Sequence, residues 1–144
     1  MDVHTEAALR LAVLDQRYTR GRRAIVEALV DAGRPLTVPE LLAGTARGAL
    51  PQSSAYRNLT VLSDAAVVHR LAGTDEFARY ELAEALAGHH HHVLCAGCGA
   101  VADVPTSDPL ERALADAGRL AADATGFDVT GHRIDLLGRC TDCR

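Results

Sequence analysis

Two Cys-x-x-Cys pairs constrain the fold of this chain more than any other feature of its sequence. Cys95 and Cys98 form the first pair, Cys140 and Cys143 form the second, and the chain has no other cysteine. Each pair can close a turn that directs two sulfur atoms at one ion, and two such turns complete a tetrahedral all-sulfur zinc site. Because 41 residues separate the pairs, the ion would join distant segments. We therefore predict a structural Zn²⁺ site.

Two other uses of paired cysteines have to be weighed against structural zinc. A single Cys-x-x-Cys can act in redox chemistry, and secreted proteins form disulfides. The first residues do not show a signal-peptide pattern, so we expect a cytoplasmic protein, in which disulfides are rare. No apolar run approaches the length of a membrane span, and we expect no membrane partner.

A run of four histidines, His89–His92, lies just before Cys95. In a strand, side chains alternate, so His89 and His91 would face one side and His90 and His92 the other. One run can therefore serve two separate metal sites. The alternatives are an expression tag or a solvated histidine-rich tract. The internal position of the run, beside Cys95, argues against a tag.

Charge is divided unevenly along the chain. Residues 1–70 have a net charge of +2 and residues 71–144 a net charge of −6, which indicates different partners for the two halves. Four arginines lie within Arg17–Arg23, just before a predicted helix, where they suit phosphate contacts. A solvated helix start is the alternative interpretation of these arginines.

The first half of the chain shows helical patterns followed by two strands. We predict helices over residues 4–14, up to Ala32, after the capping box Thr37-x-x-Glu40 with Gly44 and Gly48 at its end, and from residue 51 to 62. Strands are predicted over residues 67–71 and 77–82. Three helices and a two-stranded hairpin are typical of a winged helix-turn-helix domain.

The helix that begins near residue 51 has the pattern of a DNA recognition helix. Ala55, Leu59 and Leu62 form its apolar stripe. This stripe leaves small hydroxyl groups, one tyrosine and one arginine for an outer face that suits a major groove. An ordinary amphipathic helix is the alternative. The outer residues are Ser53, Ser54, Tyr56, Arg57 and Thr60.

The second half is predicted to form a mixed α/β unit after a linker at residues 83–88. Strands are expected at residues 89–95 and 100–104, and a helix from Asp108 to about residue 124. A further strand should begin at Phe127, with a bulge at Gly131. His132 would then share a face with apolar residues, which predicts a buried imidazole.

These motifs together resemble the ferric uptake regulator family. The histidine tract leads into Cys-x-x-Cys-Gly, His132 follows at a distance, and a second Cys-x-x-Cys ends the match. The segment Tyr56-Arg57-Asn58-Leu59 is similar to the recognition helix of the family. The resemblance covers nearly the whole chain. It implies an α+β protein with a winged-helix DNA-binding domain (1–84), a hinge (85–88), and an α/β dimerisation domain (89–144) that holds structural zinc.

The resemblance also implies a function. Members of this family are homodimeric, metal-activated repressors, not enzymes, and bind double-stranded DNA with an AT-rich inverted repeat. The structural zinc ligands would be Cys95, Cys98, Cys140 and Cys143. The regulatory site would comprise His69, Glu81, His90, His92 and Asp103. A second site would comprise His89, His91, Glu111 and His132. The DNA contacts would come from Arg20, Arg22, Ser53, Ser54, Tyr56 and Arg57.

Some of these assignments compete with simpler roles. Asp108-x-x-Glu111 is also a capping-box pattern. Asp103 is also consistent with a solvated strand end, and His69 with a structural or solvated one. Gly21 stands where the family usually has glutamine, and Ala66 where it usually has glycine.

The identity of the regulatory metal is less clearly indicated. The histidine that many iron-type members carry near Pro35 is missing, and His69 occupies a position where zinc sensors place a ligand. Glu81 stands where zinc sensors often have cysteine, which favours Fe²⁺ or Mn²⁺. We expect Zn²⁺, with an iron-, manganese- or peroxide-responsive regulator as the alternative. A metal-storage module or a metal-dependent hydrolase represents other classes, although no further catalytic constellation accompanies the histidines.

Overall fold

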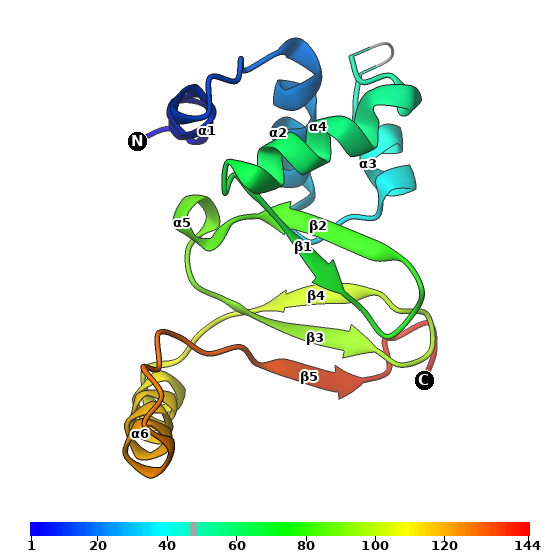
Figure 1. The fold of residues 1–144 in the computed structure, drawn as a ribbon. Helices are drawn as coiled ribbons and strands as arrows, with labels where there is room; N and C mark the ends of the chain where they lie inside the picture. Colours follow the sequence, from blue (N-terminus) through cyan, green and yellow to red (C-terminus); the bar gives the residue numbers. More distant parts are fainter. Residues whose placement is uncertain (47–48) are drawn as a thin grey trace.

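The computed structural model describes residues 1–46 and 49–144 and shows an α+β protein. The N-terminal half packs four helices against a two-stranded sheet, and the C-terminal half forms a three-stranded sheet flanked by one long helix (Figure 1). The hairpin of the first half lies next to the sheet of the second half, and the residues predicted to bind metal lie between and around these two sheets.

The N-terminal helices are α1 (Val3–Val13), α2 (Arg20–Ala32), α3 (Val38–Gly44) and α4 (Gln52–Asp64). The first three begin at capping side chains that accept backbone N–H bonds: Asp2, Thr19 and Thr37. Apolar side chains of all four form the main core, which includes Leu11, Ile25, Leu41, Leu59 and Leu62. The predicted stripe of α4 is confirmed, since its buried residues are Ala55, Leu59 and Leu62. The expected helix end at Gly48 lies outside the described residues.

The hairpin after α4 is the wing of a winged-helix unit. Strands β1 (Val68–Ala72) and β2 (Ala78–Leu82) pair antiparallel, with His69 opposite Glu81. A bridge between Leu36 and Tyr80 attaches the hairpin to the segment before α3. The helices and the two-stranded wing therefore follow one another in the order that the sequence predicts.

A short helix, α5 (Glu84–Ala87), occupies most of the predicted linker and connects the wing to the second sheet. It ends at Gly88, whose φ of +86° is a conformation that glycine adopts without steric cost. The chain therefore passes between its two halves through one ordered helical turn and a glycine.

The second sheet has the order β4-β3-β5, with β3 (His91–Cys95) at its centre. Strand β4 (Val101–Val104) pairs antiparallel and β5 (Asp135–Gly138) pairs parallel to β3. Helix α6 (Asp108–Thr125) connects β4 to the segment that leads into β5. Large apolar side chains of α6, β5 and the segment between them remain exposed: Leu110, Leu120, Phe127, Val129, Leu136 and Leu137.

Two sequence predictions for this region are wrong. Residues 127–134 form no strand, and β5 begins only at Asp135, so Gly131 is part of a loop instead of a bulge. His132 is exposed instead of buried. The apolar side chains of Phe127 and Val129 remain largely exposed, although Val129 packs beside Gly118 of α6. Within the described ranges, no helix has the length and apolar character to cross a membrane.

Candidate metal centres and DNA-binding face

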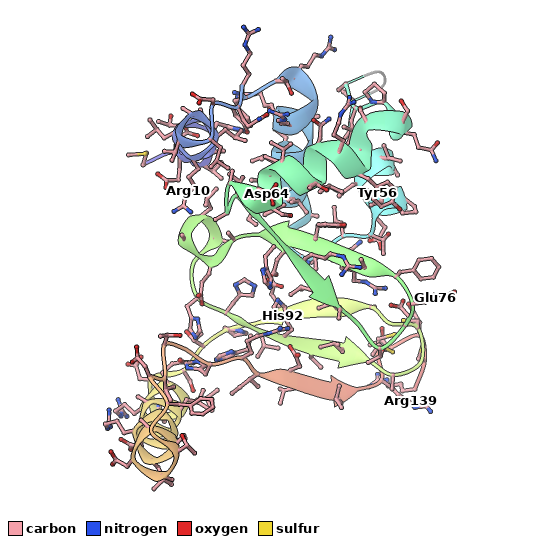
Figure 2. All side chains as sticks on the ribbon, viewed as in Figure 1. Arg10, Tyr56, Asp64, Glu76, His92 and Arg139 are labelled. Carbon is pink, nitrogen blue, oxygen red and sulfur yellow. The ribbon has the colours of Figure 1, made fainter. Side chains whose placement is uncertain are left out.

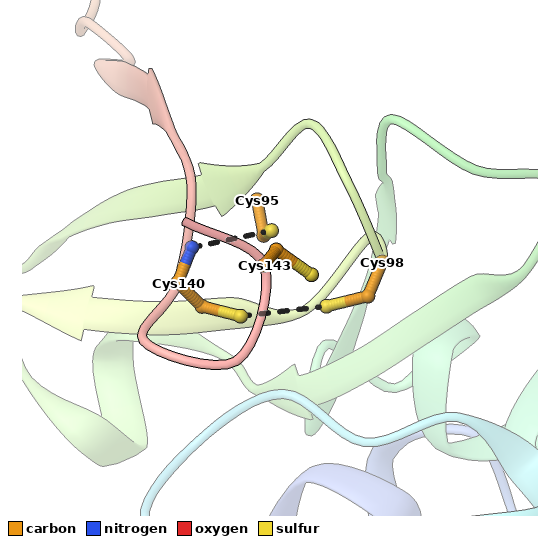
Figure 3. Close-up of side chains that lie close together, drawn as sticks. All are labelled: Cys95, Cys98, Cys140 and Cys143. Atoms are coloured by element: carbon orange, nitrogen blue, oxygen red, sulfur yellow. Dashed lines mark hydrogen bonds between the residues drawn. The ribbon is translucent and has the colours of Figure 1, made fainter.

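The four cysteines converge on one point, as the sequence predicts. Cys95 and Cys98 enclose the turn after β3, and Cys140 and Cys143 enclose a turn after β5 (Figure 3). Their sulfur atoms all lie within 4.8 Å of one another, and the Cys98 and Cys140 sulfurs are 3.8 Å apart. Sulfur atoms held about 2.3 Å from one tetrahedral zinc ion lie about 3.8 Å apart. The donor set therefore fits Zn²⁺.

The backbone of the first turn is shaped for this cluster. Gly99 has a φ of +76°, which favours glycine. Gly97 is needed for a different reason, because a Cβ atom there would lie 2.9 Å from the Cys143 side chain. The backbone N–H groups of Cys140 and Gly97 each donate to the Cys95 sulfur at 3.3 Å. Such bonds lower the pKa of Cys95 to about 6 and so favour its thiolate.

A second group joins the wing to the three-stranded sheet β4-β3-β5, which lies below the wing in Figure 1 and is called the lower sheet from here on. Glu81 of β2, His90 and His92 at the start of β3, and Asp103 of β4 place their ligand atoms within 4.8 Å of one another. His92 Nε2 lies 2.9 Å and His90 Nε2 3.1 Å from the same Glu81 oxygen. An Asp103 oxygen lies 3.8 Å from His90 Nε2. Figure 2 shows His92 between the wing and the lower sheet.

The bond at the far side of the His90 ring fixes its tautomer. Its Nδ1 lies 3.0 Å from the carbonyl oxygen of Gly88, which can only accept, so Nδ1 carries the proton. A neutral His90 then turns a lone pair on Nε2 towards a carboxylate and a second imidazole. The lone pairs of the imidazole nitrogens and the carboxylate oxygen repel one another at these distances unless the atoms share a proton or a cation. The group therefore has the donor chemistry of a divalent metal site.

The pKa shifts of the group follow from the same arrangement. Burial opposes ionisation of Glu81, but its contacts with His92 and His90 outweigh burial and lower its pKa. Burial also opposes the charged form of His90, yet the Gly88 carbonyl and Glu81 raise its pKa. Partial burial raises the pKa of Asp103. The pKa of Glu81 is therefore held low although its side chain is only 12% exposed.

His69, which the sequence adds to this site, stands apart from the four-residue group. It faces Glu81 across the β1–β2 ladder and lines the same cavity of about 260 Å³. Its ring nitrogens are not among the ligand atoms that converge.

The other predicted histidines form a third group, on the opposite side of the β3 entry. His89, His91, Glu111 of α6 and His132 have ligand atoms within 4.8 Å of one another. Glu111 lies 2.7 Å from His91 Nε2 and 3.0 Å from His132 Nε2, and its contact with His91 lowers its pKa. The alternation predicted for the histidine run is therefore correct, since odd and even positions enter different groups.

Two details of the third group escaped sequence reasoning. Glu84 of α5 contacts His89 Nδ1, which leaves His89 Nε2 to face Glu111 and His132 at 3.1 Å each. Only the spacing of five residues between Glu84 and His89 hinted at this contact. The capping-box interpretation of Glu111 is wrong, because its carboxylate contacts histidines while Ser107 occupies the cap position without a side-chain bond.

The predicted DNA-binding residues lie on α2 and α4, away from the metal groups. Tyr56, labelled in Figure 2, is 63% exposed. Arg57, Ser53 and Arg20 are exposed as well. Ser54 is half-buried and donates to the Pro51 carbonyl at 3.1 Å.

Arg22 is less free than its neighbours. It donates to the Arg17 carbonyl at 2.6 Å and to the Asn58 amide oxygen at 3.2 Å. Arg22 therefore connects the start of α2 to α4, the helix predicted to contact DNA. Of the three arginines predicted to contact DNA, Arg20 and Arg57 are the exposed ones.

Comparisons with known proteins agree with this architecture. Residues 14–137 match the model of the ferric uptake regulator family. The chain is 31% identical over 143 residues to the peroxide operon regulator of Bacillus subtilis, covering 96% of this chain and 91% of the relative. It is 35% identical over 140 residues to the transcriptional regulator FurA of Mycobacterium bovis, covering 94% and 88%.

A solved structure shares the fold. The Helicobacter pylori ferric uptake regulator, described as having three functional metal binding sites, superposes with a TM-score of 0.77 at 20% identity and covers 99% of this chain and 94% of that one. The match of the family model over most of the chain, together with relatives above 30% identity, decides the assignment. This chain belongs to the ferric uptake regulator family of metal-responsive transcriptional regulators.

Proposed function

We propose that this protein is a metal-dependent transcriptional repressor whose regulatory ion is held by Glu81, His90, His92 and Asp103. One observation carries the proposal: Glu81 belongs to the wing, whereas the other three residues belong to the lower sheet or its entry. An ion shared by these ligands would fix the wing relative to the lower sheet. The four-cysteine group would hold structural Zn²⁺ within the lower unit.

The donor set supports Fe²⁺ or Mn²⁺ as the regulatory ion. Two imidazole nitrogens and two carboxylates without sulfur suit these ions, whereas thiolate ligands favour zinc. The sequence-based expectation of zinc depended on His69, which stands outside the converging group. Zinc stays a second candidate because His69 lines the same cavity and faces Glu81.

The arrangement supports regulation by a shift of population between wing positions. A bound divalent ion supplies the positive charge that lets Glu81, Asp103 and two imidazoles remain close together. Chains with these ligands gathered would be favoured over chains with the wing in other positions. Two recognition helices of a dimer would then be spaced for two half-sites of an inverted repeat, which we expect to be AT-rich.

The exposed apolar surface supports a homodimer. Leu136 and Leu137 lie on β5, an edge strand whose outer side is unpaired within this copy, and Phe127 and Val129 lie nearby in sequence. Exposed apolar residues that accompany an unpaired sheet edge are typical of a surface covered by another chain. We propose that the second copy covers this surface.

The proposal is tested by DNA binding in buffered metal. A duplex is first selected from a random pool by the zinc-retaining protein with Mn²⁺. Binding is then titrated with buffered Mn²⁺, Zn²⁺ and, without oxygen, Fe²⁺. We expect chelation of the regulatory ion to weaken DNA binding by at least about tenfold while the thermal midpoint changes by only a few degrees. DNA affinity that is independent of metal would refute the proposal.

Substitution of His69 distinguishes the two metal candidates. For an iron or manganese regulator, His69→Ala should leave the activating concentration of Mn²⁺ within about twofold of wild type. For a zinc regulator, the same change should raise the activating concentration of Zn²⁺ by about tenfold or more. His4→Ala, outside the three described metal groups, is the matched control.

Peroxide sensing is a further candidate within the family, favoured by the 31% identity to the peroxide operon regulator. The chemistry would be oxidation of His90 or His92 by peroxide at the iron-loaded site. The iron-loaded protein is treated with equimolar hydrogen peroxide and digested, and the masses of the peptides are measured by mass spectrometry. Gain of one oxygen atom on His90 or His92, absent with Mn²⁺, would identify a peroxide sensor; unmodified histidines would exclude it.

A further inference from the structure

The tip of the wing contacts the turn that carries the first cysteine pair. We call residues 73–77, between β1 and β2, the wing tip and residues 95–99 the cysteine turn. The Thr74 hydroxyl donates to the carbonyl oxygen of Cys95 at 2.7 Å, although the two residues are 21 positions apart in the sequence. Figure 1 shows the wing tip beside the end of β3 and the C-terminus. The wing therefore meets the lower sheet at a place far from the regulatory ligands along the hairpin.

A partly buried ion pair shapes the wing tip for this contact. Asp75 accepts two bonds from Arg79, at 2.7 and 3.0 Å, and Arg79 is only 5% exposed. The Asp75 carboxylate packs directly over Gly99, so a Cβ atom at residue 99 would overlap it. Glycine at this position is thus required twice, by its positive φ and by the approach of the wing.

The hairpin is attached to the lower unit at two points along β3. At its base, Glu81 meets His92, the second residue of β3. At its tip, Thr74 meets Cys95, the last residue of β3. A rigid hairpin held at one end can still rotate, whereas attachment at both ends fixes its angle. The tip contact occurs together with the gathered regulatory ligands in one arrangement.

We infer that Thr74 and Asp75 are positioning residues of the regulatory metal site, acting through the angle of the wing and not through ligation. The inference rests on the proposed function. Contacts that form only when the regulatory ligands are gathered raise the fraction of metal-competent chains. Because apparent affinity falls in proportion to that fraction, loss of the tip contact must weaken metal binding at a distance.

The test measures Mn²⁺ binding by electron paramagnetic resonance in the full-length, zinc-retaining protein. Bound Mn²⁺ ions that share one affinity form one binding class. The class that is lost in a His92→Ala variant is the one that belongs to the regulatory site. Thr74→Val removes one hydrogen bond and should weaken that class by about two- to tenfold, the usual net effect of one bond. Asp75→Asn leaves Arg79 buried without its anionic partner and should weaken it by about tenfold or more. Glu76→Gln removes a charge from an exposed neighbour and serves as the matched control.

A second measurement separates positioning from general damage. The variants should need more Mn²⁺ to bind DNA, by the same factor, yet reach wild-type affinity within about twofold at saturating Mn²⁺. Their zinc content should stay at one ion per chain. An unchanged Mn²⁺ affinity in Thr74→Val, or an equal shift in Glu76→Gln, would overturn the inference. If His92→Ala removes none of the Mn²⁺ bound by the wild-type protein, the proposed function itself is refuted instead.

Discussion

His92 Nε2 lies 2.9 Å from a Glu81 carboxylate oxygen, although the chain passes through the hinge helix α5 between these two residues. This contact connects the wing of the N-terminal unit to the central strand of the lower sheet. The position of the wing therefore depends on whether Glu81 and His92 share a proton or a metal ion.

The cysteine group should take up zinc with release of protons. Hydrogen bonds from the backbone lower the pKa of Cys95 to about 6, whereas bonds among the thiols raise the pKa of Cys143 to about 12 and also raise that of Cys98. At pH 7.5 the metal-free group thus holds Cys95 as thiolate and Cys98 and Cys143 as thiols. Zinc needs thiolates, so at least two protons should leave. Calorimetry in buffers of different ionisation enthalpy counts them.

The sign of the pH dependence follows from this count. Zinc affinity should rise with pH near neutrality by at least about a hundredfold per pH unit, because two or more protons leave for each ion bound. In the metal-free protein, the depressed pKa of Cys95 stabilises the fold fully only above pH 9, and this contribution is lost as pH falls towards 6. Zinc uptake without proton release would contradict the proposed ligand set.

Glu84→Gln should weaken the second histidine group without affecting the regulatory one. The Glu84 carboxylate contacts His89 Nδ1 and so directs His89 Nε2 towards Glu111 and His132. Loss of such an outer partner typically lowers metal affinity about ten- to a hundredfold. Competition with a chromophoric chelator, using Co²⁺, measures the affinity of each site. Asp123→Asn, at an exposed position of α6, should leave both affinities unchanged.

Local sequence patterns were sufficient for most of the fold because each is read from neighbouring residues. The capping box Thr37-x-x-Glu40 appears as predicted, with Thr37 bonded to both the backbone and the side chain of Glu40. Alternation along the histidine run assigned His89 and His91 to one group and His90 and His92 to another. The cysteine spacing located a site whose two halves are joined only by the fold.

The failures concern residues whose environment is set by distant segments. Phe127 and Val129 alternate as in a strand, but no strand among the described residues pairs with them. His132 was expected to be buried on the face it would share with Ile134 and Leu136, and it is instead exposed beside Glu111. The contact of Thr74 with Cys95 depends on the angle between two units, which no local pattern records.

Arg57→Ala should weaken DNA binding without destabilising the fold. Arg57 is exposed on α4, and the residues beneath it, Ala55 and Leu59, keep the helix packed. If Arg57 contacts phosphate, its loss should lower affinity about equally for all sequences and reduce the salt slope by about one. If it reads a base, discrimination should fall by about 1–3 kcal/mol at one position. Fluorescence anisotropy over a range of salt concentrations distinguishes these contacts; an unchanged affinity would remove Arg57 from the interface.

Ala66→Gly should stabilise the protein, because Ala66 adopts a left-handed backbone conformation. Its φ is +53°, at the second residue after α4. A left-handed conformation costs a residue with a Cβ atom about 1–2 kcal/mol, and glycine avoids this cost at some loss of chain entropy. We expect the free energy of unfolding to rise by about 0.5–1 kcal/mol, measured by urea denaturation of the zinc-loaded protein at 25 °C.

The neighbouring alanine provides the control for this change. Ala65 has a φ of −80° and is buried, so Ala65→Gly relieves no strain, adds flexibility to the unfolded chain and removes a buried methyl group. It should lower the free energy of unfolding by about 1–2 kcal/mol. Opposite signs for the two substitutions would establish that the chain tolerates strain at the entry to its wing. Equal destabilisation by both would show that the backbone at Ala66 is not strained in solution.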